Sequence, residues 1–234
     1  PSDYFNTVLY TGDASSPRTI SGVGFQPDWN WSKSRNSADY DHNVADSVRG
    51  GSAYYLKTNT DVAETGNPAA GYVSSFNSDG YVLTAGGSNN TNYNNNSTTY
   101  VSWNWKAGTS FTNDASSTSI GSIDSAGSVS DISGFSIVSF TGTGSNGTIK
   151  HGLSTAPNLF IIKRLDADND WRVGSSALTN FVKHVNLNTE AAQSDLASAF
   201  NSTAPTSSVF SVGTSASTNA SGGTYIAYCF SSIK

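Results

Sequence analysis

The chain has 234 residues, of which 12% are charged and 12% aromatic, and its net charge is -5 at pH 7. This acidic balance, with scattered Lys and Arg, excludes the clustered positive charge that nucleic-acid binding requires. Membrane insertion is not expected either, because no run approaches the roughly 18–20 apolar residues that a spanning helix needs. Abundant Gly, Ser, Thr and Asn beside many aromatic residues indicate ordered β-structure with polar turns.

The first predicted strand has a counterpart much later in the chain. Phe5-Asn-Thr-Val-Leu-Tyr-Thr-Gly12 matches Phe135-Ser-Ile-Val-Ser-Phe-Thr-Gly142, and both segments have the pattern of a strand that ends in a Thr-Gly turn. Self-similarity at a long spacing is typical of a duplicated architecture. We therefore expect the two halves of the chain to repeat element by element.

The next matched strands each follow a proline. Residues 29–33, Trp-Asn-Trp-Ser-Lys, alternate aromatic and small polar side chains, which places them on opposite faces of a strand. Their counterparts at residues 159–163, Leu-Phe-Ile-Ile-Lys, are apolar on both faces. We expect the face of Asn30 and Ser32 to be wet, and the second copy to be covered on both sides by a further layer or a partner.

Each half closes with an aromatic strand, at residues 99–105 and 224–230. In the first of these, Val101, Trp103 and Trp105 share one face, whereas the opposite face carries a tyrosine, a serine and an asparagine. We expect the bulky apolar face to be the core face. The matching bulky face of the second copy is formed by Ile226, Tyr228 and Phe230.

This repeat predicts an all-β protein of two tandem antiparallel β-sandwich domains of jelly-roll type. The first domain is expected at residues 1–108 and the second at 109–234, with 109–133 forming a linker and an edge strand. An alternative is one large sandwich built from both halves. Cys229 is the only cysteine, so no disulfide can form within the chain.

Several motifs resemble repeats of virion proteins from marine and aquatic tailed phages. They are Gly22–Asp28, Asp46–Gly50, Ser75–Gly80 and Thr99–Gly108 in the first half, and Gly134–Val138, His151–Leu153, Ala204–Phe210 and Gly223–Phe230 in the second. The resemblance implies concanavalin-like or laminin-G-like jelly rolls in tail-fibre-like proteins at the virion surface, with glycan binding as an accompanying function. It supplies no catalytic residue. One departure is residues 29–32, which are commonly more apolar in that family.

The sequence predicts no catalytic site. Glycoside hydrolysis generally uses two carboxylates around the scissile bond, and the only two glutamates, Glu64 and Glu190, occupy nearly equivalent positions in separate halves. Cys229 takes the place of Asn104 in the other copy, which indicates a packing residue rather than a nucleophile. We therefore expect a protein that is not an enzyme.

A candidate metal site is the acidic run Asp166-Ala-Asp168-Asn-Asp170, since calcium takes oxygen ligands and alternating carboxylates can surround it. The run lacks the glycine and distal glutamate of the helical calcium loop. The alternative is an acidic hairpin turn without metal. No other cofactor is expected.

Candidate glycan contacts are the aromatic residues predicted to lie in loops, because sugar C–H faces stack on rings. They are Tyr40, Tyr93 and Trp171. Tyr93 lies in the Asn-rich tract between Gly86 and Thr98, which we predict to be a surface loop. The alternative for all three is ordinary packing in the core or at its rim.

The sequence thus favours a non-enzymatic structural protein of the phage virion surface, as a tail fibre, spike or capsid decoration component. Its expected partners are other virion proteins, further copies of itself in a homo-oligomer such as a trimer, and host-surface glycans. Two alternatives from other classes are a free carbohydrate-binding lectin and, less favoured, a polysaccharide depolymerase.

Overall fold

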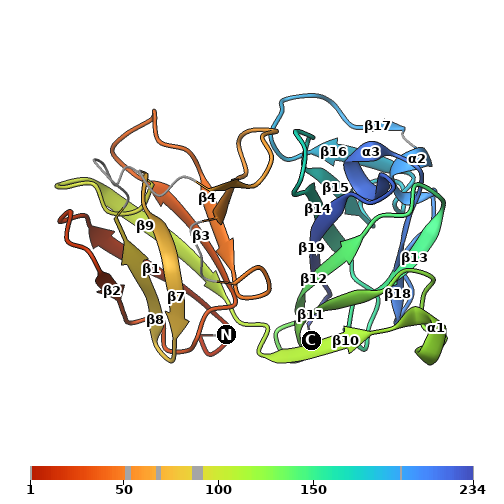
Figure 1. The fold of residues 1–234 in the computed structure, drawn as a ribbon, viewed down its shortest axis with the longest axis horizontal. Coiled ribbons are helices and arrows are strands. Elements are labelled where there is room, and N and C mark those ends of the chain that lie inside the picture. Colours follow the sequence, from red (N-terminus) through yellow and green to blue (C-terminus); the bar gives the residue numbers. More distant parts are fainter. Residues whose placement is uncertain (1, 51–53, 67–69, 86–91, 196, 234) are drawn as a thin grey trace. The chain divides into compact units, whose positions relative to one another are not determined.

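The computed structural model describes residues 2–50, 54–66, 70–85, 92–195 and 197–233. The chain forms two compact units: unit 1 comprises Pro1–Asn59 and Glu64–Gly108, and unit 2 comprises Thr60–Ala63 and Thr109–Lys234. Antiparallel strands and three short helices make up the regular structure described (Figure 1). The predicted all-β class with antiparallel sandwich sheets is confirmed. The break after Gly108 coincides with the predicted domain boundary.

Unit 1 contains a six-stranded sheet of order β1-β9-β3-β4-β5-β6 and a three-stranded sheet of order β2-β8-β7. Its described strands are β1 (Phe5–Thr11), β2 (Arg18–Ile20), β3 (Trp29–Ser34), β4 (Asn43–Asp46), β5 (Tyr54–Lys57), β6 (Thr65–Gly66), β7 (Tyr72–Asn77), β8 (Gly80–Thr84) and β9 (Thr99–Trp105).

Unit 2 contains an eight-stranded sheet of order β10-β11-β12-β19-β14-β15-β16-β17 and a pair, β13-β18. Its described strands are β10 (Thr109–Asn113), β11 (Ser125–Ser130), β12 (Phe135–Thr141), β13 (Gly147–Lys150), β14 (Leu159–Arg164), β15 (Arg172–Ser175), β16 (Lys183–Asn186), β17 (Ser194–Asp195), β18 (Val209–Val212) and β19 (Thr224–Phe230). Its described helices are α1 (Ala115–Thr118), α2 (Ala197–Phe200) and α3 (Ala216–Asn219).

Strand pairing corresponds between the units. The order β1-β9-β3-β4-β5-β6 recurs as β12-β19-β14-β15-β16-β17, and the register Phe5↔Trp105 recurs as Phe135↔Phe230. A stacked ring pair also recurs at equivalent places, with centroids 5.2 Å apart in the first unit and 5.1 Å in the second. These pairs are Tyr10–Tyr100 and Phe140–Tyr225. The two units thus share a strand order and a register over these six strands.

Unit 2 has two strands more along one edge of its sheet. β11 pairs with β12, and β10 pairs with β11 to form the new edge. Gly127 allows β11 to approach closely, because a Cβ atom there would lie 2.0 Å from the Ile137 carbonyl oxygen. Residues 109–133 therefore include the edge strand expected from the sequence, whereas β1, the counterpart of β12, ends its sheet in unit 1.

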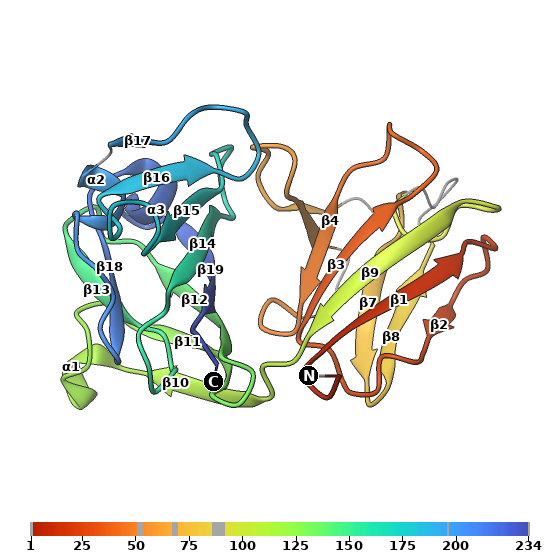
Figure 2. The same cartoon turned by 180° about the vertical axis from the view of Figure 1, so that it is seen from behind.

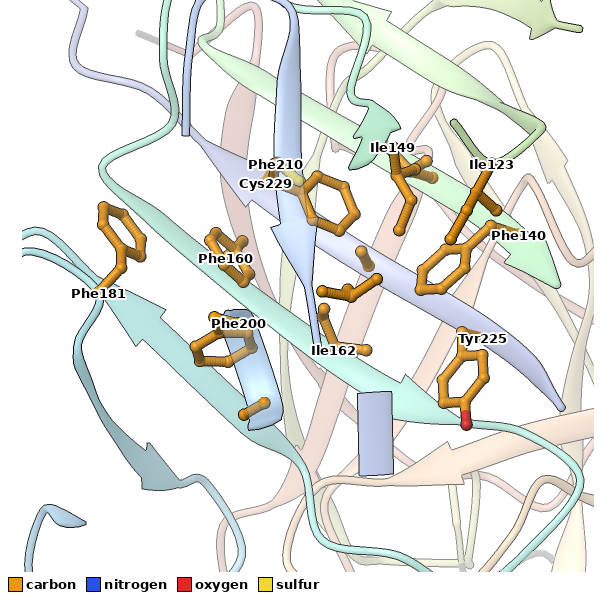
Figure 3. Close-up of a cluster of buried hydrophobic side chains, with 14 of the residues drawn as sticks. Ile123, Phe140, Ile149, Phe160, Ile162, Phe181, Phe200, Phe210, Tyr225 and Cys229 are labelled. Carbon is orange, nitrogen blue, oxygen red and sulfur yellow. The ribbon is translucent and has the colours of Figure 1, made fainter. Parts of the chain in front are cut away.

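The core of unit 2 is apolar and rich in aromatic residues. β14 and β19 direct one face toward β13-β18, and Phe160 lies among Phe181, Phe200 and Phe210 (Figure 3). Ile161 and Lys163 on the opposite face of β14 are buried as well. Both faces of this strand are therefore covered, as the apolar sequence of residues 159–163 predicts.

The core of unit 1 differs, and here the prediction was wrong. Asn30, Ser32, Ser102 and Asn104 lie on the inner face of β3 and β9, and none of them is exposed. Their side chains satisfy one another: Asn30 Nδ2 donates to Asn104 Oδ1 at 2.8 Å, and the Ser32 hydroxyl donates to Asn30 Oδ1 at 2.8 Å. Asn104 Nδ2 in turn donates to the Ser102 hydroxyl at 3.1 Å. Buried polar groups are tolerated when they are paired in this way.

The segment Thr60–Ala63 belongs to unit 2, which the predicted boundaries did not anticipate. Lys163 Nζ donates to the carbonyl oxygens of Asp61 and Asn169, both at 2.7 Å. Burial lowers the pKa of this lysine to about 8. The two carbonyl oxygens supply the polar partners that a fully buried ammonium group requires.

Candidate ligand-binding site

The outer face of β1, β9 and β3 carries large aromatic side chains. Because side chains alternate along a strand, burial of the Asn and Ser face turns Trp31, Trp103 and Trp105 outward, where each is half-buried. Phe5 joins them from β1 and is 40% exposed. Trp103 and Trp105, which we expected in the core, thus belong to the outer face of this sheet in unit 1.

These rings surround a pocket of about 280 Å³. Its lining consists of Phe5, Trp31, His42, Trp103 and Trp105. The ring centroids of Phe5 and Trp105 are 4.7 Å apart, and those of Trp31 and Trp103 are 6.2 Å apart with nearly perpendicular planes. At these distances the rings of each pair contact each other, so together they form an apolar wall that lines the pocket.

His42, just before β4, supplies the polar contribution to this pocket. Trp31 Nε1 donates to His42 Nδ1 at 3.2 Å, so the proton of the neutral imidazole is on Nε2. The His42 amide donates to Asn59 Oδ1, and its carbonyl oxygen accepts from the Thr58 amide. Hydrogen bonds to both the imidazole and the backbone of His42 therefore fix the position of the ring.

Burial lowers the pKa of His42, and the positive charge of Lys33 lowers it further. The Asp41 carboxylate acts in the opposite direction, but it is already paired with Lys57 Nζ at 2.7 Å. His42 is therefore neutral near pH 7, with Nδ1 available to accept from Trp31.

The aromatic residues predicted as glycan contacts lie elsewhere. Tyr93 and Trp171 are completely buried, and Tyr93 belongs to the core of unit 1. Tyr40 is half-buried, and its hydroxyl accepts from Asn95 Nδ2 at 3.1 Å. The expectation that Tyr93 is exposed was wrong, because residues 92–94 turn inward; residues 86–91 of the same tract lie outside the described part of the chain.

The three carboxylates proposed for calcium are engaged separately. Asp166 pairs with Arg164 at 2.9 Å, and Asp168 accepts from the Ala63 amide at 2.8 Å. Asp170 accepts from two asparagine side chains of the following hairpin, Asn186 and Asn188. Among the described residues, no group of three or more His, Cys, Asp or Glu side chains is placed to hold a metal ion. The alternative of an acidic turn agrees with these contacts.

A larger pocket, of about 630 Å³, lies in unit 2. Serine and threonine residues dominate its lining, and Asp124 is its only acidic residue. The two aromatic rings in its wall, Phe140 and Tyr225, are buried and stacked on each other. This larger pocket therefore lacks exposed ring faces. The smaller, aromatic pocket of unit 1 is the better candidate for a ligand-binding site.

Four further reactive side chains have structural partners or are buried. His151 contacts the Thr206 carbonyl oxygen at 3.1 Å, and His184 contacts the Arg172 guanidinium at 2.9 Å. Cys229 is buried, which raises the pKa of its thiol to about 12. Glu64 pairs with Arg49 at 2.6 Å. Neither of the two pockets contains a pair of carboxylates.

The sequence held one signal for the aromatic surface. The counterparts of Asn30, Ser32 and Asn104 in the second half are Phe160, Ile162 and Cys229, and those residues are fully apolar or nearly so. Because residues 159–163 are apolar on both faces, this correspondence indicates that the Asn and Ser face of unit 1 can be an inner face, but it does not distinguish the two faces.

The fold and the pocket define an all-β protein of two units with an aromatic pocket in the first. The chain belongs to the family described as "Domain of unknown function (DUF7483)", which it matches over residues 1–234. No curated protein and no solved structure matches the chain. In the described part of the chain, none of the helices has the length and apolar character needed to cross a membrane.

Proposed function

We propose that this protein is a non-enzymatic component of a bacteriophage particle surface and that the aromatic pocket of unit 1 binds a carbohydrate of the host surface. The pocket carries this proposal: its partly exposed indole and phenyl rings offer apolar faces on which the C–H faces of a sugar ring can stack, and His42 Nε2–H offers a donor to a hydroxyl group. The virion assignment rests on the resemblance of both halves to phage repeats.

A pocket of about 280 Å³ accommodates a monosaccharide or one unit of a longer chain. Its lining carries no carboxylate and no metal ligand other than His42, so binding would proceed without bond cleavage. This favours a receptor-binding role, in a fibre, a spike or a capsid decoration protein that assembles with other virion proteins. A glycan array probed with the whole protein, with and without calcium, tests the binding.

We expect Trp103→Ala to weaken glycan binding about tenfold or more, because it removes a ring face from the pocket while leaving the buried network intact. Isothermal titration with the best array hit measures this. Tyr54→Ala is the matched control, since Tyr54 is 53% exposed and does not line the pocket. Equal affinities for Trp103→Ala and wild type would refute the site.

We also expect affinity to fall at low pH. The pKa of His42 is lowered below its ordinary value of 6.5, so the Trp31–His42 bond and the stability it contributes are fully present above that value. Both are lost as pH falls through the lowered pKa, because a protonated Nδ1 cannot accept. Titrations of a neutral glycan between about pH 8 and pH 4.5 would show the decrease. The affinity of His42→Phe should change little with pH. If the affinity of this variant fell at low pH as steeply as that of the wild type, the proposed role of His42 would be contradicted.

Mass spectrometry of purified particles tests the location independently. Peptides of the chain should appear in the virion fraction. Their absence would remove the virion assignment and leave a free lectin as the remaining function of the pocket.

A further inference from the structure

β1 ends the six-stranded sheet of unit 1, and no described strand pairs with the backbone groups on its outer edge. The bonds Lys106 N–H to Tyr4 O and Gly12 N–H to Thr98 O show that even-numbered residues of this segment face β9. The odd-numbered residues therefore direct their N–H and C=O groups to the other side. They are Phe5, Thr7, Leu9 and Thr11, and no strand pairs with them within the described residues (Figure 2).

This edge lacks the usual protection against pairing. Natural edge strands are short, bulged, charged or interrupted by proline. β1 has seven residues, Phe-Asn-Thr-Val-Leu-Tyr-Thr, with no charge, no proline and a regular register. On its exposed face Leu9 is 60% and Phe5 is 40% accessible. By contrast, β6 and β17 have two residues each, and β7 carries a bulge between Val73 and Ser75.

Unit 2 shows what covers the equivalent edge. There β11 pairs with β12 along its length, with Phe135 opposite Ser130 and Ser139 opposite Ala126. The counterpart of Phe5 is therefore fully buried in unit 2. In unit 1 no described strand occupies the place beside β1 that β11 occupies beside β12 in unit 2. A β-strand of another chain can pair there.

We propose that β1 pairs antiparallel with β1 of a second copy of the chain, about a two-fold axis at Thr7. In this register Thr7 faces Thr7, and Phe5 of each copy faces Leu9 of the other on the same side of the sheet. The two exposed large side chains of the strand thus cover each other. Such an interface is isologous and closes after two copies.

Charge is complementary in the same register. Asp3, in the turn before β1, comes to the end of the partner strand where Arg18 donates to the Thr11 carbonyl oxygen at 2.7 Å. Asp3 of each copy would thus approach Arg18 of the other, although Arg18 Nη1 already donates to Asn94 Oδ1 at 2.6 Å and lies 3.4 Å from the Asp13 carboxylate of its own chain. The Thr7 amide now donates to Asn6 Oδ1, an exposed contact with the preceding side chain that the partner's carbonyl oxygen would replace.

The first test is the mass of the protein in solution, measured by sedimentation equilibrium. Wild type should be a dimer. Leu9→Lys, which places like charges in the interface, and Thr7→Pro, which removes an outward N–H without touching the β9 pairing, should be monomers. Ile132→Lys is the control, because Ile132 is 70% exposed in a turn of unit 2, and it should stay dimeric. A wild-type monomer at concentrations up to about 1 mM would overturn the proposal.

The second test fixes the register. Opposed residues of a hydrogen-bonded pair lie about 5.5 Å apart at Cα, within reach of a disulfide. Thr7→Cys should therefore form a cross-linked dimer under mild oxidation, whereas Thr11→Cys, more than about 20 Å from its copy, should not. The only native cysteine, Cys229, is buried and does not interfere. Equal cross-linking of both variants, or a dimer that survives Leu9→Lys and Thr7→Pro, would contradict pairing through β1.

Discussion

Phe160→Ala should cost unit 2 about 3–5 kcal/mol of unfolding free energy. The Phe160 ring is completely buried, with the centroids of Phe200 at 4.8 Å, Phe181 at 5.3 Å and Phe210 at 5.3 Å. Removing it leaves a cavity that strands β14 and β18 cannot close, since both are fixed by sheet pairing. Hydrogen exchange followed by mass spectrometry on β14 and β19 peptides measures the loss for this unit alone.

Ile132→Ala is the matched control for this measurement. The Ile132 side chain is 70% exposed, so its truncation should change stability by no more than about 0.5 kcal/mol. A loss below about 1 kcal/mol for Phe160→Ala would mean that the ring cluster is not the centre of the unit.

The buried polar network of unit 1 should behave as a coupled set. Asn104→Leu leaves Asn30 Nδ2 without its acceptor, and Asn30→Leu leaves Asn104 Oδ1 without its donor. Each single substitution should cost about 1–3 kcal/mol, because an unpaired buried polar group retains its full desolvation cost. The double variant should cost less than the sum, since neither asparagine then leaves the other unpaired, although the Ser32 hydroxyl still loses Asn30 Oδ1 as its acceptor. Hydrogen exchange of β3 and β9 peptides measures all three variants.

Unit 2 supports this expectation, because the equivalents of Asn30 and Asn104 are Phe160 and Cys229, an apolar pair at the same place in the sheet. A coupling free energy of about 0.5–3 kcal/mol between the two substitutions is expected. Strictly additive losses would show that the two asparagines stabilise the unit independently.

Much of the architecture could be predicted from residue patterns. The alternation in residues 99–105 and 224–230 indicated the long central strands, and the repeat indicated where the second unit begins. Alternation identifies the two faces of a strand, but it does not say which face is inside. For β3 and β9, the Asn and Ser face can be the inner one because Asn30, Ser32 and Asn104 form hydrogen bonds with one another. Asn104 lies on a different strand from Asn30 and Ser32, so the sequence of a single strand does not reveal this pairing.

The candidate site was missed for the same reason. The alternation of residues predicted Trp31 and Trp103 on the core face, and exposed rings were therefore expected in loops. Two of the residues expected there, Tyr93 and Trp171, are buried. Tyr93 follows a polar tract, yet Tyr10 donates its hydroxyl proton to the Tyr93 carbonyl oxygen and draws that turn into unit 1. A long-range contact of this kind overrides the local preference of Asn-rich sequence for the surface.

The polar interior of unit 1 also affects how this unit responds to temperature. Unfolding it exposes amide and hydroxyl groups together with hydrocarbon, and hydration of the two kinds of surface changes the heat capacity in opposite directions. We therefore expect the heat-capacity increment per residue of unit 1 to be smaller than that of the phenylalanine-rich unit 2. Its stability curve should be correspondingly flatter, so that cooling should weaken the first unit less than the second.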